Sequence, residues 1–341
     1  MATQAAEAAA AMTTQEETAA AQAGDPPSAP VWKVLWCLDA WADLAARVAA
    51  RLPPWAALHV FDPAAGSLAA QAAGATVLIP TTGPVDAAVI AAAAPTLRLI
   101  VQPASGVENI DLDAARAAGV PVLACPAVNA DACAEAAAMG LLTAARHWKG
   151  LAASVAAGII GSPPGTTLAG KTLGVVGAGG AIGSRLARIA REGLRMEVVG
   201  WGRADAAAGG RAGFHAWLAN LDALSLHCPL SPETAGLVDA AALAAVKPGL
   251  ILVNFSRGAV VDEGGLLAAL QDGRVGAAAL DVFVREPVDP ASHPLASHPR
   301  VVVTPHCGVA TEEVYEEYAR RIVAAMEVVR GGGEVSAGRV A

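Results

Sequence analysis

The sequence predicts an α/β protein with two doubly wound lobes, each built around a parallel sheet. Short apolar segments such as "VWKVLWCL" (31–38) and "LILVNF" (250–255) alternate with Ala-rich helical stretches along most of the chain. Strands that alternate with helices form parallel sheets with right-handed crossovers. A length of 341 residues also favours two domains over one.

A first series of strands precedes a segment rich in Gly and Pro. The strands expected after residues 31–38 are "ALHVF" (57–61), "ATVLIP" (75–80) and "LRLIVQ" (97–102). The segment "GIIGSPPGTTLAGK" (158–171) predicts a boundary, because Gly and Pro interrupt helices and strands. The second series consists of "TLGVVG" (172–177), "MEVVG" (196–200), "ALSLHC" (223–228), "LILVNF" (250–255), "AAALDV" (277–282) and "VVVTPH" (301–306).

Composition and charge exclude several classes of partner. The net charge is −8 and the basic residues are scattered, so we expect neither nucleic acid nor a membrane surface as partner. No apolar run approaches the ~18 residues that a membrane span needs. The five cysteines are far apart without a C-x-x-C pair, which predicts reduced thiols and no metal site. These features favour a cytoplasmic protein.

Residues 1–30 are predicted to be a disordered tail. They are rich in Ala, contain no Lys or Arg, and carry Glu7, Glu16, Glu17 and Asp25. A transit peptide would be rich in Arg and poor in acids, and a signal peptide would have a basic start and an apolar centre. The tail fits neither pattern, although organellar targeting stays open because such signals are irregular.

The segment "TLGVVGAGGAIGSRLARIA" (172–190) predicts a dinucleotide site. A strand, a Gly-rich turn and an amphipathic helix follow one another, so that backbone N–H groups can approach a pyrophosphate at the helix N-terminus. Gly177, Gly179 and Gly183 form G-x-G-x-x-x-G, one residue longer than the usual fingerprint. Counted back from Gly183, Ala178 would stand in the place of the first glycine. The alternative is an ordinary tight turn.

The end of the next strand indicates which dinucleotide binds. An NAD-binding chain usually carries an acid there, which binds the ribose 2′-hydroxyl. In "MEVVGWGRAD" (196–205) the strand is followed by Gly202 and Arg203 instead. A guanidinium favours the 2′-phosphate, so NADP(H) is the expected cofactor and NAD(H) the alternative. In that alternative Arg203 is a solvated loop residue and Asp205 binds the ribose.

Three strand ends of the second series carry reactive side chains. Arg257, Glu286 and His306 follow the strands at 250–255 and 277–282 and end the strand at 301–306. Ligands of parallel sheets bind beyond the carboxyl ends of the strands, so we expect the three to meet beside a nicotinamide. A guanidinium can hold the carboxylate of a 2-keto acid, and an imidazolium can protonate its carbonyl oxygen. A carboxylate on the far ring nitrogen would orient the imidazole. Each residue alone could be an ordinary loop residue, and their coincidence favours a catalytic set.

Longer motifs resemble the D-isomer-specific 2-hydroxyacid dehydrogenase family. The resemblance covers about residues 31–330 and implies that Arg257, Glu286 and His306 are the catalytic residues of a dehydrogenase acting on small 2-keto or 2-hydroxy acids. The motifs are "SGVENIDLDAARAAGVPV" (105–122), "LHCPLSPETAGLVD" (226–239), "LVNFSRGAVVDEGGLLAAL" (252–270), "GAAALDVFVREP" (276–287) and "VVVTPHCGVAT" (301–311).

The resemblance implies further site residues. The loop "ASGVEN" (104–109) would hold the substrate carboxylate with backbone amides at Ser105, Gly106 and Val107, together with Arg257. The cofactor contacts implied, added to Gly177, Gly183 and Arg203, are Gly179, Gly180, Ala181, Ile182, Thr234, Phe255, Ser256, Asp281 and Gly308.

The resemblance also implies the architecture. A Rossmann nucleotide-binding lobe (130–308) would be inserted into a flavodoxin-like substrate lobe (31–129 and 309–341), and the protein would be a homodimer. The Gly202–Arg203 pair is similar to that of NADPH-dependent glyoxylate/hydroxypyruvate reductases. Glyoxylate and hydroxypyruvate are therefore the leading substrates. The alternatives are a D-3-phosphoglycerate dehydrogenase and a non-catalytic, dinucleotide-sensing protein like a corepressor.

Overall fold

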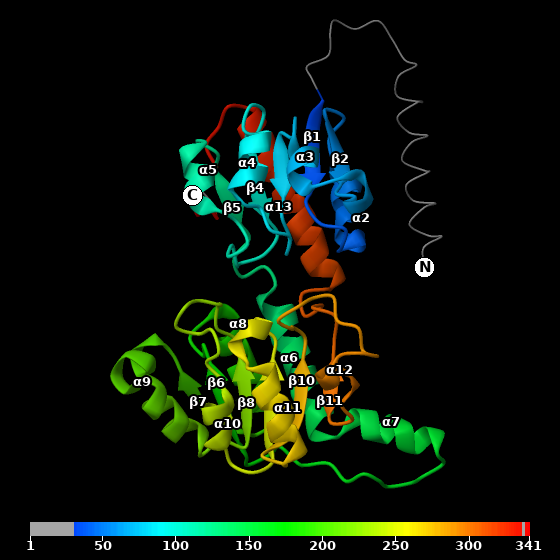
Figure 1. The fold of residues 1–341 in the computed structure, drawn as a ribbon, viewed down its shortest axis with the longest axis vertical. Coiled ribbons are helices and arrows are strands. Elements are labelled where there is room, and N and C mark those ends of the chain that lie inside the picture. The colour runs from blue at the N-terminus through cyan, green and yellow to red at the C-terminus, as the bar shows by residue number, and fades with distance from the viewer. Residues whose placement is uncertain (1–30, 336–337) are drawn as a thin grey trace, which may run out of the picture.

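The computed structural model describes residues 31–335 and 338–341, and in it the chain forms two lobes (Figure 1). One lobe contains a five-stranded sheet of order β2-β1-β3-β4-β5, and the other a six-stranded sheet of order β11-β10-β9-β8-β6-β7. Every strand pair in both sheets is parallel. The predicted fold class is therefore confirmed, whereas the predicted tail at 1–30 lies outside the described residues.

The first sheet belongs to the first lobe. β3, β4 and β5 are buried along their whole length, as is typical of parallel strands covered on both faces. The direction of winding reverses between β1 and β3, which is where such sheets form ligand crevices. The elements are β1 (Trp32–Trp36), α2 (Ala42–Arg51), β2 (Ala56–Val60), η1 (Pro63–Ala65), α3 (Leu68–Ala72), β3 (Val77–Ile79), α4 (Ala87–Ala93), β4 (Leu99–Gln102), α5 (Leu112–Ala117) and β5 (Val122–Ala124).

The second sheet begins after a long helix, α6 (Ala130–Ala145), which packs against it with α8. α9, α10 and α11 contribute to the hydrophobic cluster on the other side, so both faces of the sheet are covered. The elements after α6 are α7 (Trp148–Ala156), β6 (Thr172–Val176), α8 (Ala181–Arg188), η2 (Ile189–Gly193), β7 (Glu197–Trp201), α9 (Arg203–Leu218), β8 (Ala223–Leu226), α10 (Ala240–Ala244), β9 (Leu250–Asn254), η3 (Gly258–Val260), α11 (Glu263–Gln271), β10 (Val275–Leu280), α12 (Pro294–Ser297) and β11 (Val301–Val303).

The last helix, α13 (Glu312–Arg330), returns to the first lobe after the chain has left the second sheet (Figure 1). Its N-cap is Thr311, whose hydroxyl accepts the backbone N–H of Val314 at 3.3 Å. Its apolar face belongs to the same core cluster as β1, β3 and β4. In the sequence, the second lobe is therefore inserted between two segments of the first. The exact domain boundaries, at 129/130 and 308/309, stay a prediction. The buried α13 residues are Val314, Tyr318, Ala319, Ile322, Ala325 and Met326.

Helix α7 projects from the second lobe (Figure 1). None of its residues is buried. Trp148 at its first position is 57% exposed, and Val155 near its end is 81% exposed. The predicted boundary segment follows, and Ile160 in it is 98% exposed. No helix among the described residues is both long and apolar enough to cross a membrane.

Candidate active site

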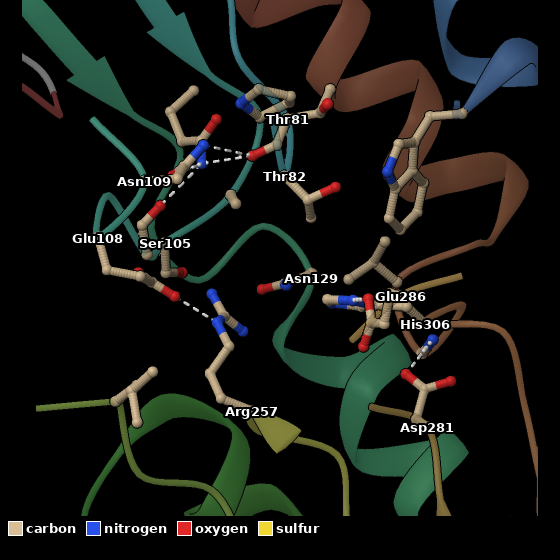
Figure 2. A pocket seen from close by; sticks show the side chains of 18 of the residues that line it. Thr81, Thr82, Ser105, Glu108, Asn109, Asn129, Arg257, Asp281, Glu286 and His306 are labelled. Atoms are coloured by element: carbon tan, nitrogen blue, oxygen red, sulfur yellow. Dashed lines mark hydrogen bonds and ion pairs between the residues drawn. The ribbon is translucent and has the colours of Figure 1, made fainter. Parts of the chain in front are cut away.

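A cavity of about 550 Å³ lies between loops of the two lobes (Figure 2). Its walls include the loops after β1, β3 and β4 of the first sheet and those after β9, β10 and β11 of the second. The carboxyl ends of both parallel sheets therefore contribute to one site. The predicted site residues that line it are Ser105, Gly106, Ile182, Phe255, Arg257, Asp281, Glu286, His306 and Gly308.

His306 and Glu286 form a hydrogen-bonded pair in this wall. Nδ1 of His306 lies 2.7 Å from one carboxylate oxygen of Glu286, and the other oxygen accepts the Phe283 N–H at 2.9 Å. Burial alone would raise the pKa of Glu286, but the hydrogen bond and charge of His306, with smaller contributions from Phe283 and Arg257, hold it below its ordinary value. The ionised carboxylate can only accept, so Nδ1 carries the hydrogen. Nε2 is then the nitrogen left for proton transfer.

A buried carboxylate holds the loop that carries His306. Asp281 is 3% exposed; one of its oxygens accepts the Thr304 hydroxyl at 2.5 Å and the Cys307 N–H at 2.9 Å. The other oxygen accepts the Gly308 N–H at 3.0 Å. The His306 N–H donates to the main-chain carbonyl of Asp281 at 2.8 Å. The carboxylate of Asp281 therefore positions this loop. The predicted contact of Asp281 with a cofactor would be additional to this role.

The backbone of His306 has an unusual conformation. Its φ is +53°, in the left-handed region that residues other than glycine adopt rarely. β11 ends at Val303, and Pro305, which has no N–H to donate to a neighbouring strand, precedes the histidine. The bonds to Asp281 stabilise this turn, which directs the imidazole toward the cavity.

Arg257 reaches the cavity from the loop after β9. Asn254, which is 1% exposed, holds this loop: its amide nitrogen donates to the Arg257 carbonyl at 3.0 Å, and its oxygen accepts the Ser256 hydroxyl at 2.7 Å. The guanidinium forms an ion pair through Nε with Glu108 of the other lobe, and Nη1 donates to the Ser256 carbonyl at 2.9 Å. Its Nη2 lies 2.5 Å from the position that a Cβ on Gly106 would occupy. Arg257 thus lies directly against the loop predicted to hold a carboxylate.

That loop, residues 104–109, is held by the buried amide side chain of Gln102. The amide nitrogen of Gln102 donates to the carbonyls of Thr81 at 2.7 Å and Gly106 at 3.0 Å. It also donates to the side-chain oxygen of Asn109 at 3.1 Å. Val107, which is predicted to contribute a backbone amide, packs against the hydrophobic core of the first lobe and is not among the residues that line the cavity.

The glycine motif adopts the turn that a dinucleotide site requires. Gly177 has a φ of +80°, and a Cβ there would lie 2.6 Å from a carbonyl oxygen just after β8. Gly183 in α8 packs against the carbonyl of Gly177 too closely for a side chain. Gly177 therefore occupies the place of the first glycine, and the register that would give this place to Ala178 does not hold. The extra residue is accommodated in the turn around Gly179 and Gly180.

This turn suits a pyrophosphate. A Cβ on Gly179 would meet no atom within 4 Å, so a ligand could approach the backbone closely. α8 begins after Gly180 without a side-chain cap, which leaves the N–H groups of its first turn for an anion. Ile182 of the same turn lines the cavity with Phe255. The residues present therefore fit a dinucleotide that extends from α8 into the cavity.

The remaining predicted cofactor residues lie outside the walls of this cavity. Arg203 is exposed at the first position of α9, and no ion pair is formed by it among the described residues. The carboxylate of Asp205 accepts the Gly202 N–H at 2.8 Å and so caps α9. The hydroxyl of Thr234 accepts the Ser231 N–H at 2.8 Å within its own loop. The predicted cofactor residues outside the walls are Gly177, Gly179, Gly180, Ala181, Gly183, Arg203, Thr234 and Ser256, and the predicted substrate residue Val107 also lies outside them.

Among the cavity residues that were not predicted from the sequence to act in the site, three have polar or aromatic groups close to the predicted ones. The ring of Trp41 lies edge-on to that of His306, with 5.8 Å between the centroids. Asn129, 8% exposed, has a side-chain oxygen without a hydrogen-bond partner. Glu108 is the partner of Arg257. Of these three, only Glu108 could have been noticed in the sequence. An acidic residue is unexpected in a loop that is predicted to bind a carboxylate.

The similarity to known proteins agrees with this geometry. Residues 138–308 match the model described as D-isomer specific 2-hydroxyacid dehydrogenase, NAD binding domain. The chain is 38% identical over 257 residues to a glyoxylate reductase of Thermococcus litoralis, a match that covers 71% of this chain and 76% of that protein.

The chain belongs to the D-isomer specific 2-hydroxyacid dehydrogenase family.

Two further similarities agree with membership of this family. It is 40% identical over 272 residues to a D-3-phosphoglycerate dehydrogenase of Mycobacterium leprae, a match that covers 78% of this chain and 51% of that protein. The chain thus spans about half the length of the curated relatives of that name. The crystal structure of the TT0316 protein from Thermus thermophilus superposes with a TM-score of 0.78 at 33% identity, covering 91% of this chain and all of that one. The family predicted from the motifs is confirmed.

Substitution of Gly179 tests where the pyrophosphate lies. In Gly179→Ala the methyl group meets no protein atom but fills the space above the backbone amides. We expect the dissociation constant of the dinucleotide, measured by fluorescence titration, to rise about tenfold or more with an unchanged melting temperature. Gly193→Ala is the matched control, because a Cβ there also meets no atom within 4 Å. Equal affinity in both variants would contradict this placement.

Substitution of the Glu286–His306 pair tests proton transfer. His306 is predicted from the sequence to be the proton donor, so His306→Gln should lower kcat for keto-acid reduction about 10²- to 10⁴-fold with a small change in KM. In Glu286→Gln the imidazole loses the carboxylate that orients its ring and fixes its tautomer, so kcat should fall about tenfold or more with a small change in KM. Near-normal kcat in either variant would refute these roles.

Proposed function

We propose that the protein is an NADPH-preferring reductase of small 2-keto acids, with glyoxylate and hydroxypyruvate as the leading substrates. The observation that carries this proposal is the convergence of Arg257 and the His306–Glu286 pair on one cavity. The three residues come from different strand ends, and the walls of the cavity include Ile182 of the predicted dinucleotide loop.

Each residue of this set has a distinct task. Arg257 and the backbone amides at Ser105 and Gly106 hold the substrate carboxylate and thereby orient the keto group. A nicotinamide dinucleotide held by the glycine turn and α8 would supply the hydride for reduction of the carbonyl group. Nε2 of His306 donates a proton to the carbonyl oxygen as negative charge develops on it. Glu286 keeps the imidazole in the required tautomer and stabilises its positive charge.

The charges of the cavity favour a substrate with one carboxylate. Arg257 is the sole Lys or Arg among the described residues that line the cavity, whereas Glu108, Asp281 and Glu286 are acids. A phosphorylated substrate would require further cations for its second anionic group. This distribution supports a glyoxylate- or hydroxypyruvate-type substrate over 3-phosphoglycerate, although relatives of both names are similar to the chain.

The surroundings of Arg203 support NADP(H). The guanidinium is exposed directly after β7, where a 2′-phosphate would lie in a doubly wound lobe. The nearby carboxylate of Asp205 is engaged in capping α9, so it is a less suitable partner for a ribose hydroxyl. These two observations favour the 2′-phosphate of NADP(H) over the free hydroxyl of NAD(H).

A panel of keto acids tests the activity. Purified protein should oxidise NADPH, followed by absorbance, fastest with glyoxylate or hydroxypyruvate and more slowly with 3-phosphohydroxypyruvate. We expect kcat/KM with NADPH to exceed that with NADH, and Arg203→Ala to remove most of this difference because a charge-assisted contact to the phosphate is lost. Arg188→Ala, an exposed arginine of α8, is the control. A strong preference for NADH would refute the cofactor assignment, and binding of NADPH without turnover of any keto acid would favour a dinucleotide sensor.

We further propose a homodimer formed through α7. The helix projects from the second lobe, and Trp148, Val155 and Ile160 on and after it are 57%, 81% and 98% exposed. A second copy is the simplest partner that would cover these apolar side chains.

Ile160→Asp should therefore shift the protein from dimer to monomer in sedimentation analysis, because the interface would bury an unpaired charge. Val328→Asp places the same charge at an exposed valine of α13 and is the control. If both variants and the parent sediment identically as monomers, the dimer proposal is wrong.

A further inference from the structure

We propose that Glu108 is a specificity-determining residue that restricts the site to substrates with a single anionic charge. This inference rests on the proposed reduction of 2-keto acids and names the charge class of the substrate. It derives from the ion pair between Glu108 and Arg257, which joins the loop after β4 to the loop after β9 and so connects the two lobes.

The pair lies at the place where a substrate carboxylate is expected. A Cβ on Gly106 would meet a carboxylate oxygen of Glu108 and, at 2.5 Å, Nη2 of Arg257. Both charged groups therefore border the backbone of the loop that is predicted to hold the carboxylate. In the view of Figure 2 the guanidinium lies between Glu108 on one side and Glu286 with His306 on the other.

The hydrogen-bond donors of Arg257 are already partly engaged. A guanidinium has five N–H groups. The Nε–H of Arg257 faces Glu108, and one N–H of Nη1 donates to the Ser256 carbonyl. The donors that remain, on Nη2 and Nη1, are sufficient for one carboxylate. Arg257 can therefore bind one substrate carboxylate through two N–H groups without losing Glu108, and the single N–H that is left is too few for a bidentate contact with a further anionic group.

The balance of charge leads to the same conclusion. The positive charge of Arg257 is already opposed by Glu108, and Asp281 and Glu286 add two more acids to the walls. Neither Glu108 nor Arg257 is deeply buried, since their side chains are 35% and 33% exposed, so solvent moderates the effect without removing it. A second anionic group on the substrate would meet the field of Glu108 without a cation of its own. Two unit charges about 8 Å apart at an effective dielectric of about 40 change an affinity by about fivefold.

Variants of Glu108 separate this role from a merely structural one. In Glu108→Gln the shape is kept and the charge is lost, so kcat/KM should rise for the dianions oxaloacetate and 2-ketoglutarate relative to the monoanions glyoxylate and pyruvate. We expect the ratio of dianion to monoanion kcat/KM to increase about fivefold, and Glu108→Asp, which keeps the charge, to stay near the wild-type ratio. If the Glu108–Arg257 contact only held the lobes together, its loss would change kcat/KM for dianions and monoanions by the same factor.

Asp113→Asn is the matched control. It removes one negative charge from the same lobe, at a side chain that is 94% exposed and lies outside the cavity walls. We expect it to leave the ratio unchanged. An unchanged ratio in Glu108→Gln, or an equal change in the control, would overturn the inference.

The inference can also be tested without turnover. Calorimetric dissociation constants of malonate, a dianion, and oxamate, a monoanion, can be measured on the NADPH complexes of wild type and Glu108→Gln. The Kd of malonate relative to that of oxamate should fall about fivefold in the variant. If the wild type reduces no keto acid, the proposed function fails, while this binding ratio still supports or overturns the role of Glu108.

Discussion

The buried carboxylate of Asp281 is the constraint on which the geometry of the site depends. It accepts hydrogen bonds from the side chain of Thr304 and the backbone of Cys307 and Gly308, and its own carbonyl accepts the N–H of His306. An ion that is 3% exposed is costly unless such partners surround it. The same bonds stabilise the left-handed backbone of His306 and thereby direct the imidazole toward Glu286. A single strand-end acid thus determines the position of a residue 25 positions further along the chain.

The other functional loops are held in a similar way, by polar side chains buried at the ends of strands. Asn254 at the end of β9 bonds to the backbone of the loop that presents Arg257. Gln102 at the end of β4 donates to the Gly106 carbonyl in the loop that follows and to the Thr81 carbonyl in the loop after β3. Each buried bond contributes only about 1 kcal/mol, but a broken one would leave an unpaired polar group at a cost of about 1–3 kcal/mol. These side chains therefore limit the conformations of loops that must place charged groups accurately.

The site as a whole is acidic around one cation. Glu108, Asp281 and Glu286 line the same cavity as Arg257, and each has a separate partner: Arg257, the loop after β11, and His306. Because every acid is paired, the cavity can contain three of them and still accept an anion at Arg257. The arrangement is compatible with the proposed binding of a carboxylate at Arg257 beside the His306–Glu286 pair, in which the acid remains ionised.

The sequence by itself determined the fold class, the family and the order of the strand ends that carry Arg257, Glu286 and His306. These features depend on local patterns: apolar segments alternating with helices, a Gly-rich turn between strand and helix, and motifs contiguous in the chain. Only the tertiary structure decided that Gly177 is the first glycine of the turn, because this depends on its distance from a carbonyl after β8. Likewise, the contact of Glu108 with Arg257 and that of Trp41 with His306 join residues 149 and 265 positions apart. Such contacts are set by how the two lobes face each other, and no periodicity or spacing within one segment encodes that.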